Sequence, residues 1–167
     1  MRKAIFAAIL LTLVVVMVAP VGATPPETID ITSTSLYSFS DFGNPTGTWS
    51  SEGLIESEGD LFDILGHFGA GWPPGKGFQT THLIEVYSDD SGTMTILSQG
   101  TGFEWTYDGP YEHFEGSGNW VFLSGTGAYE NLRGQGTFDV IGDVDWGAGT
   151  MVIGATYSGQ AHFDPQE

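Results

Sequence analysis

The segment W-V-F-L-S-G-T-G-A-Y-E-N-L-R-G-Q-G-T-F, Trp120 to Phe138, decides the fold of this chain. Side chains alternate with period two along a strand, so Trp120 and Phe122 share one face of an extended segment. The glycines at positions 125 and 127 then supply the permissive backbone that a sharp reversal needs. The segment therefore predicts two strands joined by a turn.

Two more glycines, Gly134 and Gly136, recur at a spacing of two just before Phe138. On a strand they place two bare Cα atoms on one face. Such a face either admits a neighbouring backbone or bulky side chain, or marks a corner at which a barrel strand bends. The spacing favours the barrel corner, and Gly125, Gly127, Gly134 and Gly136 are predicted to form a structural turn.

The rest of the chain repeats this rhythm of short alternating segments separated by Gly, Asp, Asn and Pro. No window carries an apolar repeat at helical spacing, and the 25 glycines oppose long helices. The pattern predicts an all-β fold, a single eight-stranded antiparallel β-barrel. The predicted strands are Ser35–Phe39, Thr48–Ser57, Leu61–Phe68, Thr80–Ser88, Thr93–Tyr107, Phe114–Leu123, Arg133–Ile141 and Thr150–Phe163.

The string from Gly125 to Phe138 resembles a signature of small secreted bacterial or archaeal proteins with an allene oxide cyclase-like barrel, a branch related to dirigent proteins. Gly47-Thr48-Trp49 and Gly118-Asn119-Trp120 echo it. The resemblance implies an allene oxide cyclase-like barrel that often forms dimers or trimers. It also implies isomerisation of an unstable fatty-acid epoxide, assisted by a carboxylate and an ordered water. The catalytic residues of the cyclases align with no position here, so the catalytic residues stay unknown.

The N-terminal residues 1–23 are predicted to be a signal peptide that is removed. Arg2 and Lys3 precede an apolar run of 16 residues, Ala4–Ala19, and Val21-Gly22-Ala23 offers the small residues that a signal peptidase accepts. A retained anchor is the competing interpretation, although a spanning helix needs about 20 residues. Cleavage predicts a secreted or periplasmic protein.

After cleavage, residues 24–33 are predicted to be an extended leader and residues 34–167 the β-barrel domain.

The absence of cysteine excludes disulfides, thiol catalysis and cysteine-ligated metals. Against 21 acidic residues stand only Lys76 and Arg133, which leaves 19 negative charges net. Such a surface predicts no nucleic-acid partner and no membrane partner. The acidity indicates either a solubility or high-salt adaptation or cation binding, and the spread of the acids favours the adaptation.

Aromatic residues supply the candidate ligand-binding positions. An eight-stranded barrel is wide enough either to fill with side chains or to hold one small ligand. The functional interpretation is an apolar pocket, and the alternative is a packed core. Gly69–Gly77 is predicted to be a loop at the barrel mouth, with Trp72 as a lid. The remaining aromatic candidates are Trp105, Tyr107, Trp120 and Phe122.

Acid-base chemistry requires a carboxylate or histidine among apolar neighbours. Glu104, Glu85 and His82 are the candidates. Glu104 alternates against the aromatic face and is expected to face solvent, whereas His82 shares its face with two aliphatic residues and is the better inward candidate, unless it is simply a core histidine. No metal ligand set, nucleotide motif or cofactor motif is found.

Three functions remain open from the sequence. The first is a secreted, non-catalytic barrel that binds a small apolar ligand. The second is an allene oxide cyclase-type isomerase acting on a lipid-derived substrate. The third is a structural or assembly barrel, which forms a homo-oligomer through its outer face.

Overall fold

The computed structural model describes residues 25–41, 44–69 and 77–165, with side chains throughout except at 63–69. The predicted signal peptide lies outside these residues. Within them no helix is long and apolar enough to cross a membrane. The strands are β1 (Glu27–Ser38), β2 (Thr46–Gly53), β3 (Ser57–Gly69), β4 (Thr80–Asp89), β5 (Gly92–Asp108), β6 (Tyr111–Gly127), β7 (Leu132–Asp145) and β8 (Thr150–Phe163).

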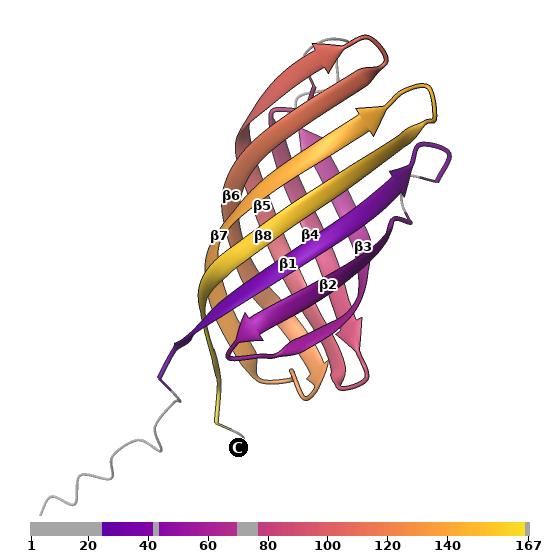
Figure 1. Cartoon of the computed structure of the whole chain (residues 1–167). Coiled ribbons are helices and arrows are strands. Elements are labelled where there is room, and N and C mark those ends of the chain that lie inside the picture. Colours follow the sequence, from indigo (N-terminus) through magenta and orange to yellow (C-terminus); the bar gives the residue numbers. More distant parts are fainter. Residues whose placement is uncertain (1–24, 42–43, 70–76, 166–167) are drawn as a thin grey trace, which may run out of the picture.

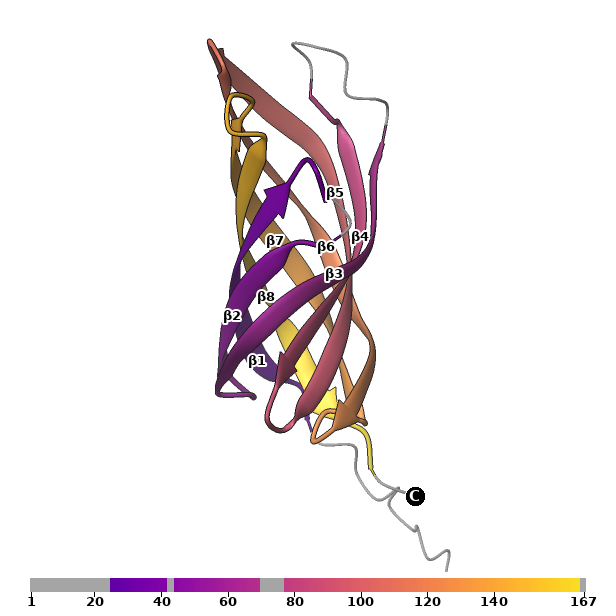
Figure 2. The ribbon, with the colours of Figure 1, turned by 90° about the vertical axis from the view of Figure 1, so that its right-hand side faces the viewer.

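The eight strands form one antiparallel sheet that closes on itself in chain order, from β1 to β8 and back to β1 (Figure 1). The closing pair joins the two ends of the domain, because Glu27 to Ser38 of β1 pair with Ala161 to Thr150 of β8. Figure 2 shows the same ring from the side, with the strands tilted around it. The predicted all-β class and the eight antiparallel strands are confirmed.

Several observed strands extend a few residues beyond their predicted ends, and two predictions are wrong in a way that changes the element assignment. The first strand begins at Glu27 rather than Ser35, so residues 27–33 belong to the sheet and not to an extended leader. The second predicted strand, Thr48–Ser57, runs through a turn, because β2 ends at Gly53, whose φ is 93°, and β3 begins at Ser57. Only glycine adopts this backbone conformation easily, so the turn interrupts an otherwise alternating sequence.

Large buried side chains fill the interior of the barrel near each of its two ends. The end that carries both termini of the described chain is packed by Trp49, Leu61, Tyr87 and Met94, each at most 2 % exposed. The opposite end, next to the β5–β6 hairpin, is closed by aromatic rings around Phe78. Between them lie the smaller and more polar inward residues, and this part of the barrel interior contains the candidate site.

The carboxylate of Asp89 connects three turns by hydrogen bonds at the end of the barrel that carries the termini. It accepts hydrogen bonds from Ser57 Oγ at the start of β3 and from the Tyr129 hydroxyl in the β6–β7 turn. It also accepts the backbone amides of Ser91 and Gly92, at 2.7 and 3.0 Å. Burial alone raises the pKa of Asp89, but these hydrogen bonds outweigh burial and lower the pKa below its ordinary value of 3.8.

We expect Asp89→Ala to lower the free energy of unfolding by about 2 kcal/mol, because charge-assisted hydrogen bonds are lost at a site that solvent partly screens. A lowered pKa stabilises the fold above the ordinary value of 3.8, and this contribution is lost as the pH falls through the lowered pKa. Urea denaturation at pH 7 and at pH 3 measures both effects. A difference between wild type and variant that stays constant with pH contradicts the role of the ionised carboxylate.

The glycines of the signature segment serve a close approach rather than a barrel corner. Gly134 and Gly136 lie within β7, whose pairing with β8 runs without a register shift, so the predicted corner is wrong there. A Cβ atom at Gly136 would lie 2.0 Å from Ser158 O and 2.8 Å from Trp120 Nε1. The indole of Trp120 donates to Thr137 O and Ser158 O at 3.1 and 3.3 Å and packs against these bare positions.

The other two signature glycines lie at the end of β6, and the chain reverses just after them, at residues 128–131. Gly127 ends β6 with a φ of 60°, the left-handed conformation that a turn there requires. A Cβ atom at Gly125 would lie 2.1 Å from Tyr129 O, so this position keeps the turn close to its strand. Both glycines therefore lie at the end of the strand, next to the turn rather than within it.

Candidate functional site

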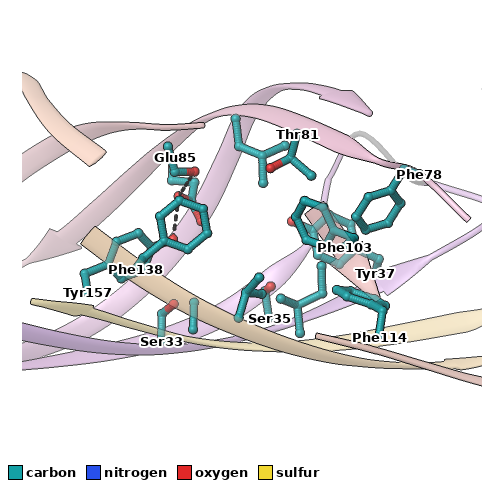
Figure 3. A pocket seen from close by; sticks show the side chains of 15 residues that line it. Ser33, Ser35, Tyr37, Phe78, Thr81, Glu85, Phe103, Phe114, Phe138 and Tyr157 are labelled. Atoms are coloured by element: carbon teal, nitrogen blue, oxygen red, sulfur yellow. Dashed lines mark hydrogen bonds between the residues drawn. The ribbon is translucent and has the colours of Figure 1, made fainter. Parts of the chain in front are cut away.

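A cavity lies inside the barrel, between the aromatic end and the end that carries the termini (Figure 3). The empty space between its side chains is about 410 Å³, part of it open to solvent, but only about 20 Å³ can receive the centre of a water molecule. One water needs about 10–15 Å³ on this measure. The cavity is thus narrow and has room for one or two waters. Its lining residues are Ser33, Ser35, Tyr37, Phe78, Thr81, Leu83, Glu85, Ser98, Phe103, Phe114, Phe138, Val140, Ile153, Ala155 and Tyr157.

A buried carboxyl group stands at one end of this cavity. Glu85 is 5 % exposed, and its Oε2 accepts hydrogen bonds from Ser98 Oγ at 2.9 Å and from the Tyr157 hydroxyl at 2.8 Å. These partners come from β5 and β8, so the cluster joins strands on different sides of the ring. In Figure 3, Glu85 lies near Tyr157 and Phe138, away from the rings of Phe78 and Phe114.

Burial controls the protonation of this cluster. It raises the pKa of the Glu85 carboxyl above its ordinary value, and the hydrogen bonds from Tyr157 and Ser98 offset only part of that effect. Burial also raises the pKa of the Tyr157 phenol, and the neighbouring Glu85 and Tyr87 raise it further. Both shifts favour the uncharged forms, as expected for ionisable groups inside an apolar barrel.

We expect Glu85 to make the fold pH-dependent. A raised pKa stabilises the fold fully below the ordinary value of 4.5, and that contribution is lost as the pH rises through the raised pKa. Relative to Glu85→Gln, the wild-type free energy of unfolding should fall with rising pH, by at most about 1.4 kcal/mol per pH unit. Urea denaturation from pH 4 to pH 9 measures this difference.

Glu104→Gln is the matched control, because it makes the same substitution at an exposed position of β5. Its stability curve should run parallel to that of the wild type. If the Glu85→Gln curve also runs parallel to the wild type, Glu85 keeps an ordinary pKa and the argument from burial fails.

The strand register explains why Glu85 points inward. Along β4, Thr81, Glu85 and Tyr87 are buried, whereas His82 is exposed. The prediction that His82 faces inward is therefore wrong. Its Nδ1 lies 3.1 Å from Gln99 Nε2 on the outer surface.

Aromatic rings close the other end of the cavity. The ring centroid of Phe78 lies 4.7 Å from that of Phe103, 4.8 Å from that of Trp105 and 5.0 Å from that of Phe114. Trp105 Nε1 also donates to Phe78 O at 2.9 Å, which holds the segment before β4 over the end of the barrel. A Cβ atom at Gly77 would lie 1.9 Å from the Trp105 indole, so the preceding position requires glycine.

The predicted ligand-binding residues lie around the cavity rather than on it. Trp105 packs behind Phe78, and Tyr107 stacks on Trp105 with 40 % of its surface exposed. Trp120 and Phe122 are buried nearer the end that carries the termini, with ring centroids 5.0 Å apart. Trp72, the predicted lid, lies outside the described residues. Glu104 is exposed, as predicted from its alternation with the aromatic face.

Several lining residues were not predicted from the sequence. Ser33 and Ser35 are small polar residues on a strand whose first half the sequence predicts as leader, and Ser98 and Tyr157 carry no local signal. Phe78 follows the predicted mouth loop and precedes β4, where its packing cannot be read from alternation. One usable signal was present, the spacing of two residues between Glu85 and Tyr87. Residues two apart on a strand face the same side, so an inward Tyr87 predicts an inward Glu85.

Comparison with known proteins adds no relative: no family model, no curated protein and no solved structure matches this chain. Among the described residues, no group of three histidine or acidic side chains is placed to hold a metal ion. The site is therefore defined by its own geometry, a buried acid beside a narrow cavity with aromatic and aliphatic walls.

Proposed function

We propose that this protein is a secreted, non-catalytic barrel that binds a small, mainly apolar molecule in its interior. The observation that supports the proposal is the position of Glu85, which is buried at one end of a cavity whose other walls are largely apolar. Small-molecule sites combine apolar walls with a few polar groups that fix the orientation of the ligand.

The energetics of the Glu85 cluster support a binding role over a purely structural one. Burying an ionisable group is costly even when it is hydrogen-bonded, and a well-packed apolar residue of similar volume is often at least as stable. If the barrel interior served only as a packed core, a buried acid beside an unfilled cavity would add nothing to the stability of the fold. Perturbed ionisable groups of this kind concentrate at functional sites.

The width of the cavity sets a condition on the ligand. Since only about 20 Å³ accepts the centre of a water molecule, anything larger enters by displacing side chains. Phe78 is the best placed to move, because it lies in a segment between strands and not within one. The proposal therefore includes an opening of the aromatic end on binding.

Native mass spectrometry of the purified protein tests the proposal. We expect a co-purified adduct of small mass, and we expect it to be lost from a variant in which Ala155→Leu fills the cavity from β8. A wild-type protein without adduct, and without uptake from a panel of small neutral apolar compounds, contradicts ligand binding. Thermal denaturation of the variant confirms that it is folded.

A second candidate function is an isomerase of allene oxide cyclase type. It is favoured by Glu85, a carboxyl group with a raised pKa beside a cavity that has room for an ordered water. Such a group can donate or accept a proton at a reacting oxygen. Generating an unstable fatty-acid epoxide in the presence of the protein tests this role. Cyclised product above the buffer rate, lost in Glu85→Gln, supports catalysis, and a rate equal to that of buffer contradicts it.

A third candidate, assembly through the outer face, is favoured by one apolar row. Leu36 of β1 pairs with Val152 of β8, and Ile141 of β7 lies against Gly154, diagonal to Val152. These three side chains are 47 %, 42 % and 56 % exposed. The same native mass spectra report the oligomeric state. A dimer or trimer that Val152→Lys converts to a monomer supports assembly, and a wild-type monomer contradicts it.

A further inference from the structure

We propose that the interior site selects uncharged molecules that carry a hydrogen-bond-accepting oxygen, and that it rejects carboxylates of the same length. This inference rests on the proposed binding in the barrel interior and specifies its ligand class. A ketone, ester, ether or epoxide belongs to this class.

The hydrogen bonds of Glu85 place its proton. Oε2 accepts from both Ser98 Oγ and the Tyr157 hydroxyl. In the described part of the chain, Oε1 has no hydrogen-bond partner. With two donors on Oε2, the acid proton of the uncharged carboxyl belongs on Oε1, beside the cavity that Glu85 lines. The O–H group at Oε1 is then a hydrogen-bond donor beside the cavity that has no acceptor in the described protein.

No described cationic side chain pairs with this carboxyl. Arg133, the one basic residue other than histidine in the described chain, is 46 % exposed and binds Asp164 at 3.1 Å. An unpaired carboxylate inside an apolar barrel is strongly disfavoured, so the uncharged acid is the stable form. A ligand carboxylate would bring a second negative charge into the same enclosed space, where like charges cannot both ionise cheaply.

A carboxylate ligand therefore has to enter as the neutral acid. An ordinary carboxyl with a pKa near 4.5 takes up a proton at pH 7 only at a cost of about 300-fold in affinity. A ketone of the same length has no such penalty. Its carbonyl oxygen can accept the Glu85 proton in place of water, while its alkyl chain lies toward the Phe78 end, where the aromatic rings gather (Figure 3).

The experiment titrates isotope-labelled protein at pH 7 with 2-heptanone, heptanoate and n-heptane, followed by two-dimensional NMR of the backbone amides. We expect 2-heptanone to bind at least about tenfold more tightly than heptanoate, with shifts at amides of β4, β5 and β8. In Glu85→Leu the affinity for the ketone relative to the alkane should fall about fivefold, the usual effect of one hydrogen bond. Glu85→Gln, which keeps a donor, should retain the preference.

Glu104→Leu, the same change on the outer surface of β5, is the control and should leave all three affinities unchanged. Heptanoate binding equal to or tighter than that of 2-heptanone overturns the selectivity while leaving the binding function intact. An unchanged ketone-to-alkane ratio in Glu85→Leu also overturns it. If none of the three compounds shifts any amide, the binding function itself fails, and the selectivity with it.

Discussion

Phe78→Ala is expected to lower the free energy of unfolding by about 3–5 kcal/mol, the usual cost of removing a fully buried phenylalanine. Phe78 is 1 % exposed, and its ring lies against those of Phe103, Trp105 and Phe114 at centroid distances of 4.7–5.0 Å. Truncation removes the ring common to all three contacts. Strand pairing holds the surrounding backbone in place, so the neighbouring side chains can fill only a small part of the cavity that the missing ring leaves. Urea denaturation monitored by circular dichroism measures the loss.

Phe62→Ala is the matched control, because Phe62 is 49 % exposed on β3 and the same atoms are removed. Its cost should stay below about 1 kcal/mol. The enlarged interior of Phe78→Ala should also take up small neutral compounds faster than the wild type does. A loss equal to that of Phe62→Ala would mean that the aromatic end of the barrel is loosely packed.

Gly136→Ala is expected to destabilise the barrel by about 3 kcal/mol, at the upper end of overpacking costs. The added methyl group would lie 2.0 Å from Ser158 O, a backbone atom that the β7–β8 pairing holds in place. It would also press on Trp120, whose indole nitrogen bonds two backbone carbonyls across these strands. Both the strand pairing and the tryptophan anchor must shift to accommodate it.

Gly154→Ala provides the comparison on the neighbouring strand. The nearest heavy atom to a Cβ atom there is Ile141 Cγ1 at 3.6 Å, an ordinary contact. Its stability should equal that of the wild type or exceed it by a few tenths of a kcal/mol, since alanine restricts the unfolded chain. Thermal denaturation of the two variants side by side measures the contrast, and equal melting temperatures would contradict the close approach at Gly136.

Much of the fold follows from alternation and turn residues, which located all eight strands. The start of β1 was missed because its inward side continues from Ile29 and Ile31 into Ser33 and Ser35, whose small hydroxyl side chains look like those of a surface strand. Small polar residues can face the interior of a barrel where larger side chains from the strands on the opposite side occupy the space. That information lies in the partner strands and not in the segment itself.

The site was harder to predict because both faces of β4 carry apolar residues, so hydrophobicity does not tell the inward face from the outward one. Its outward face carries Ile84 and Val86, and its inward face carries Leu83 and Tyr87 beside Thr81 and Glu85. The two aliphatic residues beside His82 therefore favoured His82 as the inward candidate, which is wrong. The register of the β4–β5 hairpin, which sets Tyr87 opposite Met94, fixes the faces correctly. The size of the cavity depends on how fifteen side chains fit together, which no local pattern contains.

The pairing of β1 with β8 has a consequence for the order in which the molecule forms. The two strands are separated by more than 100 residues, so their contact has a large loop-closure cost and comes late. While the chain is being synthesised, β1 has only β2 to pair with until β8 is complete. The domain then holds two open edges that attract other strands. When β8, with its 14 residues, pairs with both β7 and β1, the sheet is closed and no open edge remains. The same step therefore completes the fold and ends the period in which the domain is prone to aggregate.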